Sequence, residues 1–390
     1  MLRFETAGES HGECLVATLT GLPAGVPVSI EYLDRQLWRR QQGFGRGGRM
    51  KIETDKVHIV SGIRHSMTIG SPIALLLENK DWKNWSGILP VEAKDAGEGK
   101  DKPVTRPRPG HADLPGAIKY NFPEARYILE RASARETTAR VAIGALAKTF
   151  LKQFGIEILS HVVGVGSAKM ERHANWDEIV ELSERDEVLL GCVDAPTEAR
   201  MKEVVDHAYR TGDTVGGVFE VVAHGLPTGL GSHIAWDTRL DGRLAQAIVS
   251  IQAVKGVEIG FAEEGASSFG SAVQDTIHYD KPQQQFYRGS NRAGGLEGGI
   301  TNGEELRVRG LLKPISTLRR PLESVDLGTR DTALAAYERS DVAVIPAAGV
   351  IGEAMVAIVL SSAFLEKFGG DSIVETKRNY EGYLAQIKSF

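Results

Sequence analysis

The strongest chemical signal in the sequence is a run of arginines between residues 35 and 49. The segment RQLWRRQQGFGRGGR holds five arginines and no acidic residue. A solvated basic face is one explanation of such a run. However, Arg46 lies among four glycines, and glycine lets the backbone come close to a ligand. Because planar guanidinium groups bind phosphate and carboxylate through paired hydrogen bonds, we favour an oxyanion site.

The same segment contains GFGRGG, which matches the dinucleotide-binding pattern G-x-G-x-x-G. That pattern indicates a dinucleotide site only where a strand precedes it and a helix follows it. Here the preceding residues are polar and typical of a helix, and strand-like residues follow. A Rossmann site is therefore excluded, and the absence of a G-x-x-x-x-G-K-[ST] motif argues against a P-loop kinase.

Two histidines stand in small, turn-forming surroundings. GESHG places Ser10 and His11 between glycines, and RPRPGHAD presents His111 after two prolines and a glycine. Imidazole exchanges a proton near neutral pH, so each histidine is a candidate acid or base, with a structural role as the alternative. Adjacent residues of an extended chain point to opposite sides, which argues against His11 as the base for Ser10. A metal site at His11, His111 and Asp113 is disfavoured because the H-x-x-x-H and H-E-x-x-H spacings are missing.

Further anion-binding groups occur at 131–135 and 311–321. RASAR combines a helix-capping serine, Ser133, with two arginines, which suits either a phosphate or simple capping at the start of a helix. LLKPISTLRRP presents lysine, serine and threonine donors after a strand. These segments are candidates for phosphate or carbonyl binding.

Two more segments offer a glycine surface and a carboxylate. GGLEGGITNG (294–303) has five glycines, which lets the backbone lie against a planar ligand. YERSDVAVIP places Arg339 and Asp341 before a predicted apolar strand, where a carboxylate can orient a histidine or a ring nitrogen.

The elements that must position these groups are mixed. Residues 131–154 have the apolar spacing of a helix that ends at Gly155. The apolar stretch 342–365 predicts a buried strand, a turn and a buried helix, since a membrane span would place Glu353 near the bilayer centre. Strands are predicted in four further segments, the first read as strand, turn and strand: 14–30, 51–79, 217–227 and 304–314.

Two sequence features concern the overall organisation. VAIGALAKTFLKQFG (141–155) and VAIVLSSAFLEKFG (356–369) resemble each other, which suggests a two-fold pseudo-repeat of a sheet plus a core helix. Residues 80–116 and 262–303 are long, polar and rich in Gly and Pro, so we expect loops that cover the site rather than linkers.

Composition narrows the function classes. The chain has 390 residues, a formal net charge of −5 and 44 glycines, about 11% against a usual value of about 7%. An acidic balance argues against a general nucleic-acid binder. Two cysteines cannot form a disulfide framework, and the first residues lack the pattern of a signal peptide, so we expect a cytoplasmic protein without a membrane span.

Taken together, the segments resemble the chorismate synthase family. Matching pieces run in order from residue 8 to residue 355: GESHG, GRGGRMKIETDKV, RPGHADLPG, RASARETTARVAIG, GDTVGGVFEVVAHGLPTGLGS, AVKGVEIG, NRAGGLEGGITNGE, KPISTL and RSDVAVIPAAGVIGEAM. The resemblance covers nearly the whole chain, which implies a single domain over residues 1–390. It implies an α+β fold, a β-α-β sandwich in which antiparallel sheets flank a core of long helices with an internal pseudo-two-fold repeat. It also implies a homotetramer, built as a dimer of dimers.

The activity implied by the resemblance is a 1,4-trans elimination of phosphate from 5-enolpyruvylshikimate 3-phosphate, which gives chorismate in the shikimate pathway. The family requires reduced FMN although the reaction has no net redox change. NADPH is a possible flavin reductant, and a separate flavin reductase is the alternative. A multiply anionic substrate agrees with the arginine excess, and a planar ring agrees with the glycine-rich segment.

The resemblance also implies residue roles. His11 would protonate the departing phosphate, His111 would manage the proton on the reduced flavin, and Asp341 would assist deprotonation. Substrate anions would meet Ser10 and six arginines, of which Arg40 and Arg46 are also assigned to NADP: Arg40, Arg46, Arg49, Arg108, Arg135 and Arg339. FMN would contact Arg131, Ala132, Ser133, Gln252, Ala253, Gly298, Lys313, Pro314, Ile315, Ser316, Thr317 and Arg339. The family often has Asn or Pro at the position of Gln252, so a backbone contact is expected there rather than a side-chain contact.

Three other functions fit parts of the pattern. A phosphatase that uses a metal or a histidine would need the same arginines. An RNA-binding module would use GRGGR, although the net charge of −5 argues against it. A plain flavin reductase would consume NADPH without the shikimate-type substrate.

Overall fold

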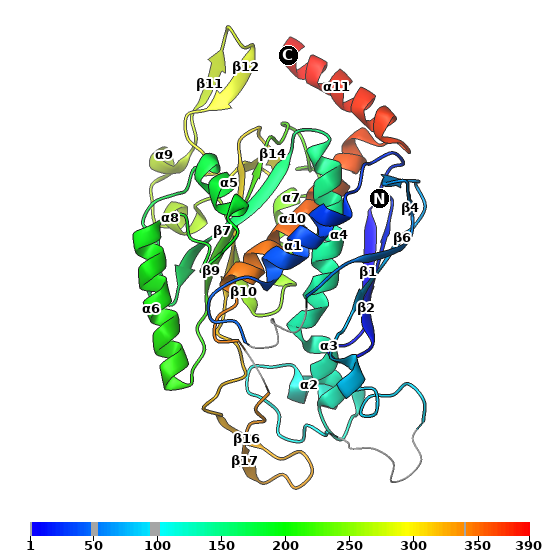
Figure 1. Ribbon diagram of the computed structural model, residues 1–390. Helices are drawn as coiled ribbons and strands as arrows, with labels where there is room; N and C mark the ends of the chain where they lie inside the picture. Colours follow the sequence, from blue (N-terminus) through cyan, green and yellow to red (C-terminus); the bar gives the residue numbers. More distant parts are fainter. Residues whose placement is uncertain (1, 48–53, 94–101, 339–340) are drawn as a thin grey trace.

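Two antiparallel sheets enclose a layer of long helices (Figure 1). The computed structural model describes residues 2–47, 54–93, 102–338 and 341–390. The first sheet has the strand order β1-β2-β6-β3, with β1 Arg3–Ala7, β2 Cys14–Thr20, β3 His58–Ser61 and β6 Ile73–Glu78. The second sheet has the order β10-β15-β9-β7-β8, with β7 Glu157–Val165, β8 Ala168–Lys169, β9 Gly217–His224, β10 Val254–Ile259 and β15 Leu306–Leu312.

Alternating side chains define the inner face of the first sheet. In β2, Leu15, Ala17 and Leu19 are buried while their neighbours are partly exposed, as expected when successive side chains point to opposite faces. The same period appears in β6. The inner face packs on helix α4 (Thr137–Lys152). The start of α4 lies beside the end of β1 and the start of β2.

The second sheet packs on helix α10 (Ile345–Phe368), which in turn crosses α4 and α1 (Ile30–Gln41). α10 is apolar all round because sheet and helices surround it. At the crossing with α4, a Cβ built on Gly144 would lie 2.2 Å from Cβ of Ala354, so only glycine permits this approach. By length and composition α10 is long and apolar enough to cross a membrane, but 89% of its most apolar window is buried inside the protein. This is weak evidence for a membrane span and is typical of the core helix of a globular protein.

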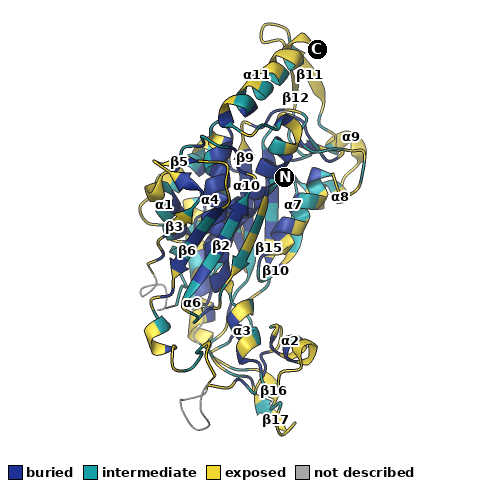
Figure 2. Cartoon of the chain, turned by 90° about the vertical axis from the view of Figure 1, so that its right-hand side faces the viewer, coloured by how far each residue is buried: buried dark blue, intermediate teal, exposed yellow. Residues whose placement is uncertain are grey.

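Smaller elements cluster at the two ends of the molecule. Helix α2 and the hairpin β16–β17 lie at one end with α3, and α11 and the hairpin β11–β12 project from the other end, where much of the surface is exposed (Figures 1 and 2). The bounds of these and the remaining elements are β4 Ile63–Arg64, β5 Met67–Thr68, η2 Trp82–Asn84, α2 Asp113–Tyr120, α3 Arg126–Ala132, η3 Ala134–Glu136, α5 Trp176–Glu184, α6 Ala195–Thr211, α7 Leu240–Val249, α8 Ala262–Ala266, α9 Gly270–Val273, β11 Ile277–Asp280, β12 Gln285–Arg288, β13 Leu296–Glu297, β14 Ile300–Thr301, β16 Glu323–Val325, β17 Thr332–Leu334 and α11 Ile373–Ser389.

Several predictions about local structure are wrong. The second strand expected within 14–30 is absent. This segment leads instead into helix α1, which begins at Ile30 with Ser29 as its N-cap. The strand expected at the start of 342–365 is also absent, because Pro346 stands in the first turn of α10. The segment 262–303 is not a bare loop but holds α8, α9 and two hairpins, and the segment 80–116 includes η2 and the start of α2.

The helix expected over 131–154 is divided. Helix α3 ends at Ala132, Ser133 is extended with ψ 141°, and the chain resumes as η3 and then α4. Ser133 is an N-cap as predicted, but it caps η3, where its side chain accepts a hydrogen bond from the Arg135 amide. The two similar segments 141–155 and 356–369 fall in α4 and α10, and each of these helices is followed by a glycine with positive φ.

Candidate active site

Most of the predicted site residues gather around the junction of α3, η3 and α4, at the end of the molecule that carries α2 (Figure 1). Three other segments reach this junction through hydrogen bonds: the loop after β1, the end of α1 and the strap 102–112. The segment after β15 in turn donates a hydrogen bond to the strap at Gly110. Helices α1, α4 and α10 contact one another and the two sheets pack on them, which brings these distant segments together.

His11 lies in the loop after β1 and is held by Glu130 of α3. Nδ1 of His11 is 2.9 Å from Oε1 of Glu130, and the His11 amide donates to Oε2 at 2.8 Å. The imidazole stacks on Trp85, with ring centroids 3.9 Å apart and planes 20° apart. The Ser10 amide donates to the Glu130 carbonyl, and Ser10 is buried. Burial raises the pKa of Glu130, but the hydrogen bonds and charge of His11 and the charge of Arg126 outweigh it and lower this pKa overall.

Asn79 joins the histidine loop to the arginines. Its side-chain amide donates to the carbonyls of Glu9 and Gly12, and its Oδ1 accepts from Nε of Arg135 at 2.8 Å. The GESHG turn itself needs glycine at its start, since Gly8 has φ +98° and an added Cβ would meet the Cys14 carbonyl at 2.3 Å. The turn and Arg135 therefore share one rigid support at the end of β6.

Arg40 and Arg135 form a buried cationic pair around Asp55. Arg135 donates to Asp55, while Arg40 donates to Thr137 Oγ1 at 3.0 Å and to the Ala134 carbonyl at 2.8 Å. Nη1 of Arg40 lies 3.7 Å from Oδ2 of Asp55, and neither of these two buried atoms has a hydrogen-bond partner among the described residues. Burial lowers the pKa of Arg40 to about 9, with the charges of Arg135 and Arg46 acting in the same direction and that of Asp55 against it.

Arg46 and Asp341 meet beside this pair. Nη1 of Arg46 is 3.1 Å from Oδ2 of Asp341, and the Gly47 amide donates to the same carboxylate. Asp341 thus contacts an arginine and a backbone amide. The glycine-rich turn makes this contact possible: Gly45 has φ +87°, and a Cβ there would lie 2.9 Å from Val205. Arg49 and Arg339 lie outside the described residues.

His111 has a carboxylate partner of its own. Its Nδ1 is 2.6 Å from Oδ1 of Asp113, which is fully buried. Arg108 binds the same carboxylate through Nε at 2.8 Å and Nη2 at 3.0 Å, and donates from Nη1 to Thr317 Oγ1 at 2.8 Å. Burial raises the pKa of Asp113, but the hydrogen bonds and charges of His111 and Arg108 lower it far below its usual range.

The segment Lys313–Thr317 continues from this group. Nζ of Lys313 donates to Ser316 Oγ at 2.8 Å, and Ser316 donates to the Gly110 carbonyl at 2.9 Å. The Lys313 amide donates to the Ala253 carbonyl at 3.0 Å, and the Ile315 carbonyl accepts from Thr214. Burial, with a smaller effect of Lys255, lowers the pKa of the Lys313 amine. The two motifs RPRPGHAD and KPIST therefore form one surface, with Pro314 exposed between Lys313 and Ile315.

On the two sides of the break at Ser133, Arg131 is exposed and Arg135 is buried. Arg131 is exposed and donates to the carbonyls of Thr6 and Gly8 at 2.8 and 3.0 Å. Beside it, Glu136 accepts from Gln252 Nε2 at 3.3 Å, and Oε1 of Gln252 is buried without a hydrogen-bond partner in the described part of the chain. Ala132 and Ser133 are partly exposed between these groups. Ala253 has φ +69°, a left-handed conformation that is unusual for a residue other than glycine.

Gly298 does not join this group within one chain. It lies in the turn between β13 and β14, which connects through Gly294 and Arg307 to the Leu306 end of β15. Lys313 follows the other end of the same strand, and seven residues at about 3.3 Å each span about 20 Å. Gly298 and the Lys313–Thr317 segment are therefore at opposite ends of the second sheet.

Sequence reasoning missed the groups that hold the predicted residues. They are Glu130, Asp55, Asn79, Trp85 and Arg126. Asp113 was considered only as a metal ligand, yet it accepts from Arg108 and contacts His111. No group of three or more His, Cys, Asp or Glu side chains suited to a metal ion occurs in the described ranges.

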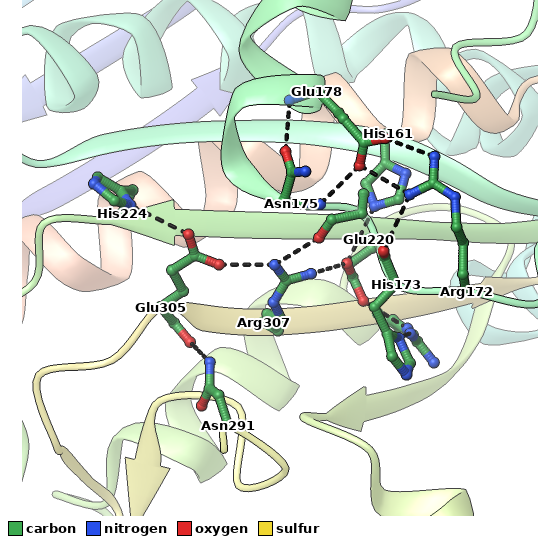
Figure 3. A network of polar contacts seen from close by, with 12 residues as sticks. His161, Arg172, His173, Asn175, Glu178, Glu220, His224, Asn291, Glu305 and Arg307 are labelled. Carbon is green, nitrogen blue, oxygen red and sulfur yellow. Dashed lines mark hydrogen bonds and ion pairs between the residues drawn. The ribbon is translucent and has the colours of Figure 1, made fainter. Parts of the chain in front are cut away.

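A second polar network lies on the second sheet, away from this junction (Figure 3). Glu220 of β9 accepts from Arg307 at 2.9 Å and from Arg309 at 2.7 Å, and contacts His161 at 3.1 Å. Burial raises the pKa of Glu220, but His161 and the two arginines lower it to about 2. Because Glu220 binds both arginines directly, the network ties neighbouring strands together.

Comparison with known proteins agrees with the motifs. The chorismate synthase family model matches residues 2–365. The chain is 75% identical to the chorismate synthase of Solibacter usitatus and 65% identical to that of Koribacter versatilis, with 100% of each chain covered. A crystal structure of a chorismate synthase superposes with a TM-score of 0.79 at 42% identity, and the match covers 100% of this chain and 99% of that one.

Proposed function

The chain belongs to the chorismate synthase family, and we propose that the junction of α3, η3 and α4 with its bound segments is its active site. The activity is that of the family, a carbon–oxygen lyase (EC 4.2.3.5) of the shikimate pathway. It eliminates phosphate from 5-enolpyruvylshikimate 3-phosphate to give chorismate. The residues of the junction divide into an anion site, a set of proton-transfer groups and a flavin site.

One observation carries the assignment of the substrate site. Three guanidinium groups, those of Arg40, Arg46 and Arg135, are crowded around two carboxylates, those of Asp55 and Asp341, and burial and the neighbouring arginines depress the pKa of Arg40. An anion placed there would relieve this repulsion and supply an acceptor to the buried Nη1 of Arg40. These arginines, with Ser10 and Arg108, bind the phosphate and carboxylates of the substrate, and Arg49 and Arg339 complete the set.

His11 is the acid that protonates the departing phosphate. The Glu130 carboxylate holds its ring through Nδ1, and Asn79 connects its loop to Arg135 of the anion site. His111, held by Asp113, and Asp341, held by Arg46, exchange the remaining protons. Each of the three groups is thus held by an oppositely charged neighbour.

The residues beside the substrate site fit reduced FMN. Arg131 and Lys313 supply positive charge, and Ser316 and Thr317 supply hydroxyl groups. Within the described residues, the buried Oε1 of Gln252 has no hydrogen-bond partner, and together with the left-handed Ala253 it marks a surface on which the backbone comes close to a ligand. Ala132, Ser133, Pro314, Ile315 and Arg339 belong to the same FMN set. When bound, reduced FMN supplies electron density to the breaking carbon–oxygen bond without net redox change.

The position of Gly298 supports an assembly of more than one chain. Within one chain, the length of β15 separates Lys313 from Gly298. A single FMN could therefore contact both residues only by spanning the whole of β15, or if Gly298 comes from a second copy of the chain. Beside Gly298, the loop that carries Ile234 and Trp236 exposes 78% and 86% of these side chains, which favours a covered interface. We assign a homotetramer built as a dimer of dimers. Each chain is a single domain over residues 1–390, with pseudo-two-fold halves around α4 and α10. We assign a cytoplasmic location to the enzyme. NADPH, bound near Arg40 and Arg46, or a separate reductase supplies reduced flavin.

An anaerobic assay tests the function. The protein is mixed with dithionite-reduced FMN and 5-enolpyruvylshikimate 3-phosphate, and chorismate is followed by its absorbance. Omission of either component should abolish the signal. Phosphate release without flavin would instead indicate a phosphatase.

A substitution tests the assignment of His11. His11→Ala should lose turnover while it still binds substrate and FMN, because the lost group acts on the leaving phosphate. His207→Ala, an exposed histidine on α6, is the matched control and should keep full activity. Unchanged turnover in His11→Ala would remove His11 from the mechanism.

A further inference from the structure

We propose that Glu130 is the positioning residue for His11 and that it determines which ring nitrogen of His11 delivers the proton. This inference rests on the proposed role of His11 as the acid. Glu130 belongs to α3, whereas His11 lies in the loop after β1, more than a hundred residues earlier in the chain. The contact between them therefore depends on the fold and not on local sequence.

Both oxygens of the Glu130 carboxylate face the same histidine residue. Oε1 lies 2.9 Å from Nδ1, and Oε2 accepts the His11 backbone amide at 2.8 Å. The carboxylate has an exposed fraction of only 1%, so water competes little for these contacts. Two contacts to one residue fix both the backbone and the ring of His11, and a carboxylate can accept both because it carries no hydrogen of its own.

The imidazole is also held against rotation by its neighbours. Trp85 stacks on one face of the ring at 3.9 Å, and the indole Nε1 donates to Asp81 at 3.1 Å. Lys102 and Arg126 lie over the Trp85 ring, at 4.4 and 5.4 Å from its centroid. A small turn of the imidazole about its χ2 bond would break the stack, and a 180° flip would keep the stack but replace Nδ1 by Cδ2 opposite Glu130.

This arrangement determines which ring nitrogen of His11 carries hydrogen. In the neutral ring, Nδ1 carries the hydrogen that it donates to Glu130, which leaves Nε2 as the atom that gains and loses the second proton. In the charged ring both nitrogens carry hydrogen, and the Nδ1 hydrogen still faces the Glu130 carboxylate. When the carbon–oxygen bond of the substrate breaks, the Nε2 proton passes to the phosphate oxygen. The neutral Nδ1–H ring remains bound to Glu130.

Arg126 extends the contact towards the segment that carries Asp341. Its Nη1 is 3.4 Å from Oε1 of Glu130, and its Nη2 donates to Glu338 at 3.1 Å, three residues before Asp341. The guanidinium of Arg126 is itself buried, with its Nε bound to the Lys102 carbonyl at 2.8 Å. Glu130 is thereby held between a histidine and an arginine, and its carboxylate has little freedom to move.

Glu130→Gln is the decisive substitution. A glutamine has one acceptor oxygen and one NH₂ group, so either the amide or Nδ1 of His11 would face a donor. We expect kcat to fall about 10- to 100-fold, a part of the 10²- to 10⁴-fold that a general acid contributes, with KM for the substrate within about two-fold of the parent. Glu9→Gln is the matched control, because Glu9 is an exposed glutamate of the same loop. It should keep the parent kcat.

A second measurement does not depend on turnover. In protein labelled with ¹⁵N-histidine and loaded with FMN, magic-angle-spinning NMR distinguishes the two neutral tautomers, and a His11→Gln sample identifies the His11 signals. We expect hydrogen on Nδ1 in the parent and a shift towards Nε2 in Glu130→Gln. Hydrogen on Nε2 in the parent, or a parent-like kcat in Glu130→Gln, would overturn the proposal. If His11→Gln were active while the parent and Glu130→Gln showed the expected tautomers of His11, the role of His11 as the acid would be refuted but the Glu130 contact would be supported.

Discussion

Glu353 offers a quantitative test of how the core supports the site. This residue of α10 is 1% exposed and lies among three helices and a strand. Its carboxylate accepts two hydrogen bonds from Arg39, each 2.7 Å long, one from Lys148 at 2.6 Å and one from Ser160 at 2.7 Å. Burial raises the pKa of Glu353, but Arg39 and Lys148 lower it to about 2. The carboxylate is therefore charged at neutral pH and neutralises one of two buried cations.

Glu353→Gln keeps the shape of the side chain and removes its charge. Arg39 and Lys148 would then be buried without a counter-charge, which costs about 3–5 kcal/mol for a broken buried pair. Unfolding entropy near 2.1 cal/mol/K per residue gives roughly 0.8 kcal/mol/K for this chain, so each kcal/mol corresponds to about 1.2 °C. We expect the melting temperature to fall by about 4–6 °C. Because Arg39 adjoins Arg40 at the end of α1, KM for the substrate should rise as well.

The assay is differential scanning calorimetry at one subunit concentration and one scan rate. Glu366→Gln is the matched control: it lies on the same helix and pairs with Arg243 at 2.7 Å, but its side chain is 39% exposed. An exposed pair contributes about 0–1 kcal/mol, so this variant should shift the melting temperature by about 1 °C or less. Equal shifts in the two variants would refute the reasoning from burial.

Two further predictions concern the glycine turn and acid stability. Gly45→Ala should lower the free energy of unfolding by about 1–3 kcal/mol and raise KM for the substrate. The reason is that φ +87° and a Cβ only 2.9 Å from Val205 force the turn that carries Arg46 to move. Calorimetry and initial rates at varied substrate concentration test this prediction, and a parent-like stability and KM would contradict it. The pKa of Glu220, about 2, lies below the ordinary 4.5, so Glu220 stabilises the fold fully above pH 4.5 and loses this contribution as the pH falls towards 2. In a series of melting temperatures at decreasing pH, the melting temperature of Glu220→Gln should therefore fall less steeply than that of the parent.

The sequence predicted groups that carry chemistry better than it predicted their partners. Arginine in a glycine-rich turn, histidine in a tight turn and lysine after a strand are local patterns, and the structure places these segments around one junction. Glu130 and Asp55 lie far along the chain from the groups they bind, at separations of 119 and 80 residues. No local periodicity encodes such pairs, because they arise only when α3, α4 and the first sheet are packed.

Element boundaries failed where local chemistry overrode the pattern. The apolar run after Asp341 has the composition of a strand, yet Pro346 and the surrounding core make it the first turn of α10. The segment 131–154 has one helical period, but the Ser133 side chain starts a new turn and divides it. Gly298 was assigned with the FMN residues from the family pattern, and the length of β15 separates it from them within one chain.

The interruption at Ser133 has a consequence for how two ligands are spaced. In an unbroken helix, residues four apart occupy the same face, so Arg131 and Arg135 would reach in one direction. With Ser133 extended, Arg131 turns to the carbonyls of Thr6 and Gly8 at the surface, and Arg135 turns to Asp55 in the interior. In the proposed site, the separation of an outer and an inner anion therefore depends on the backbone conformation of Ser133.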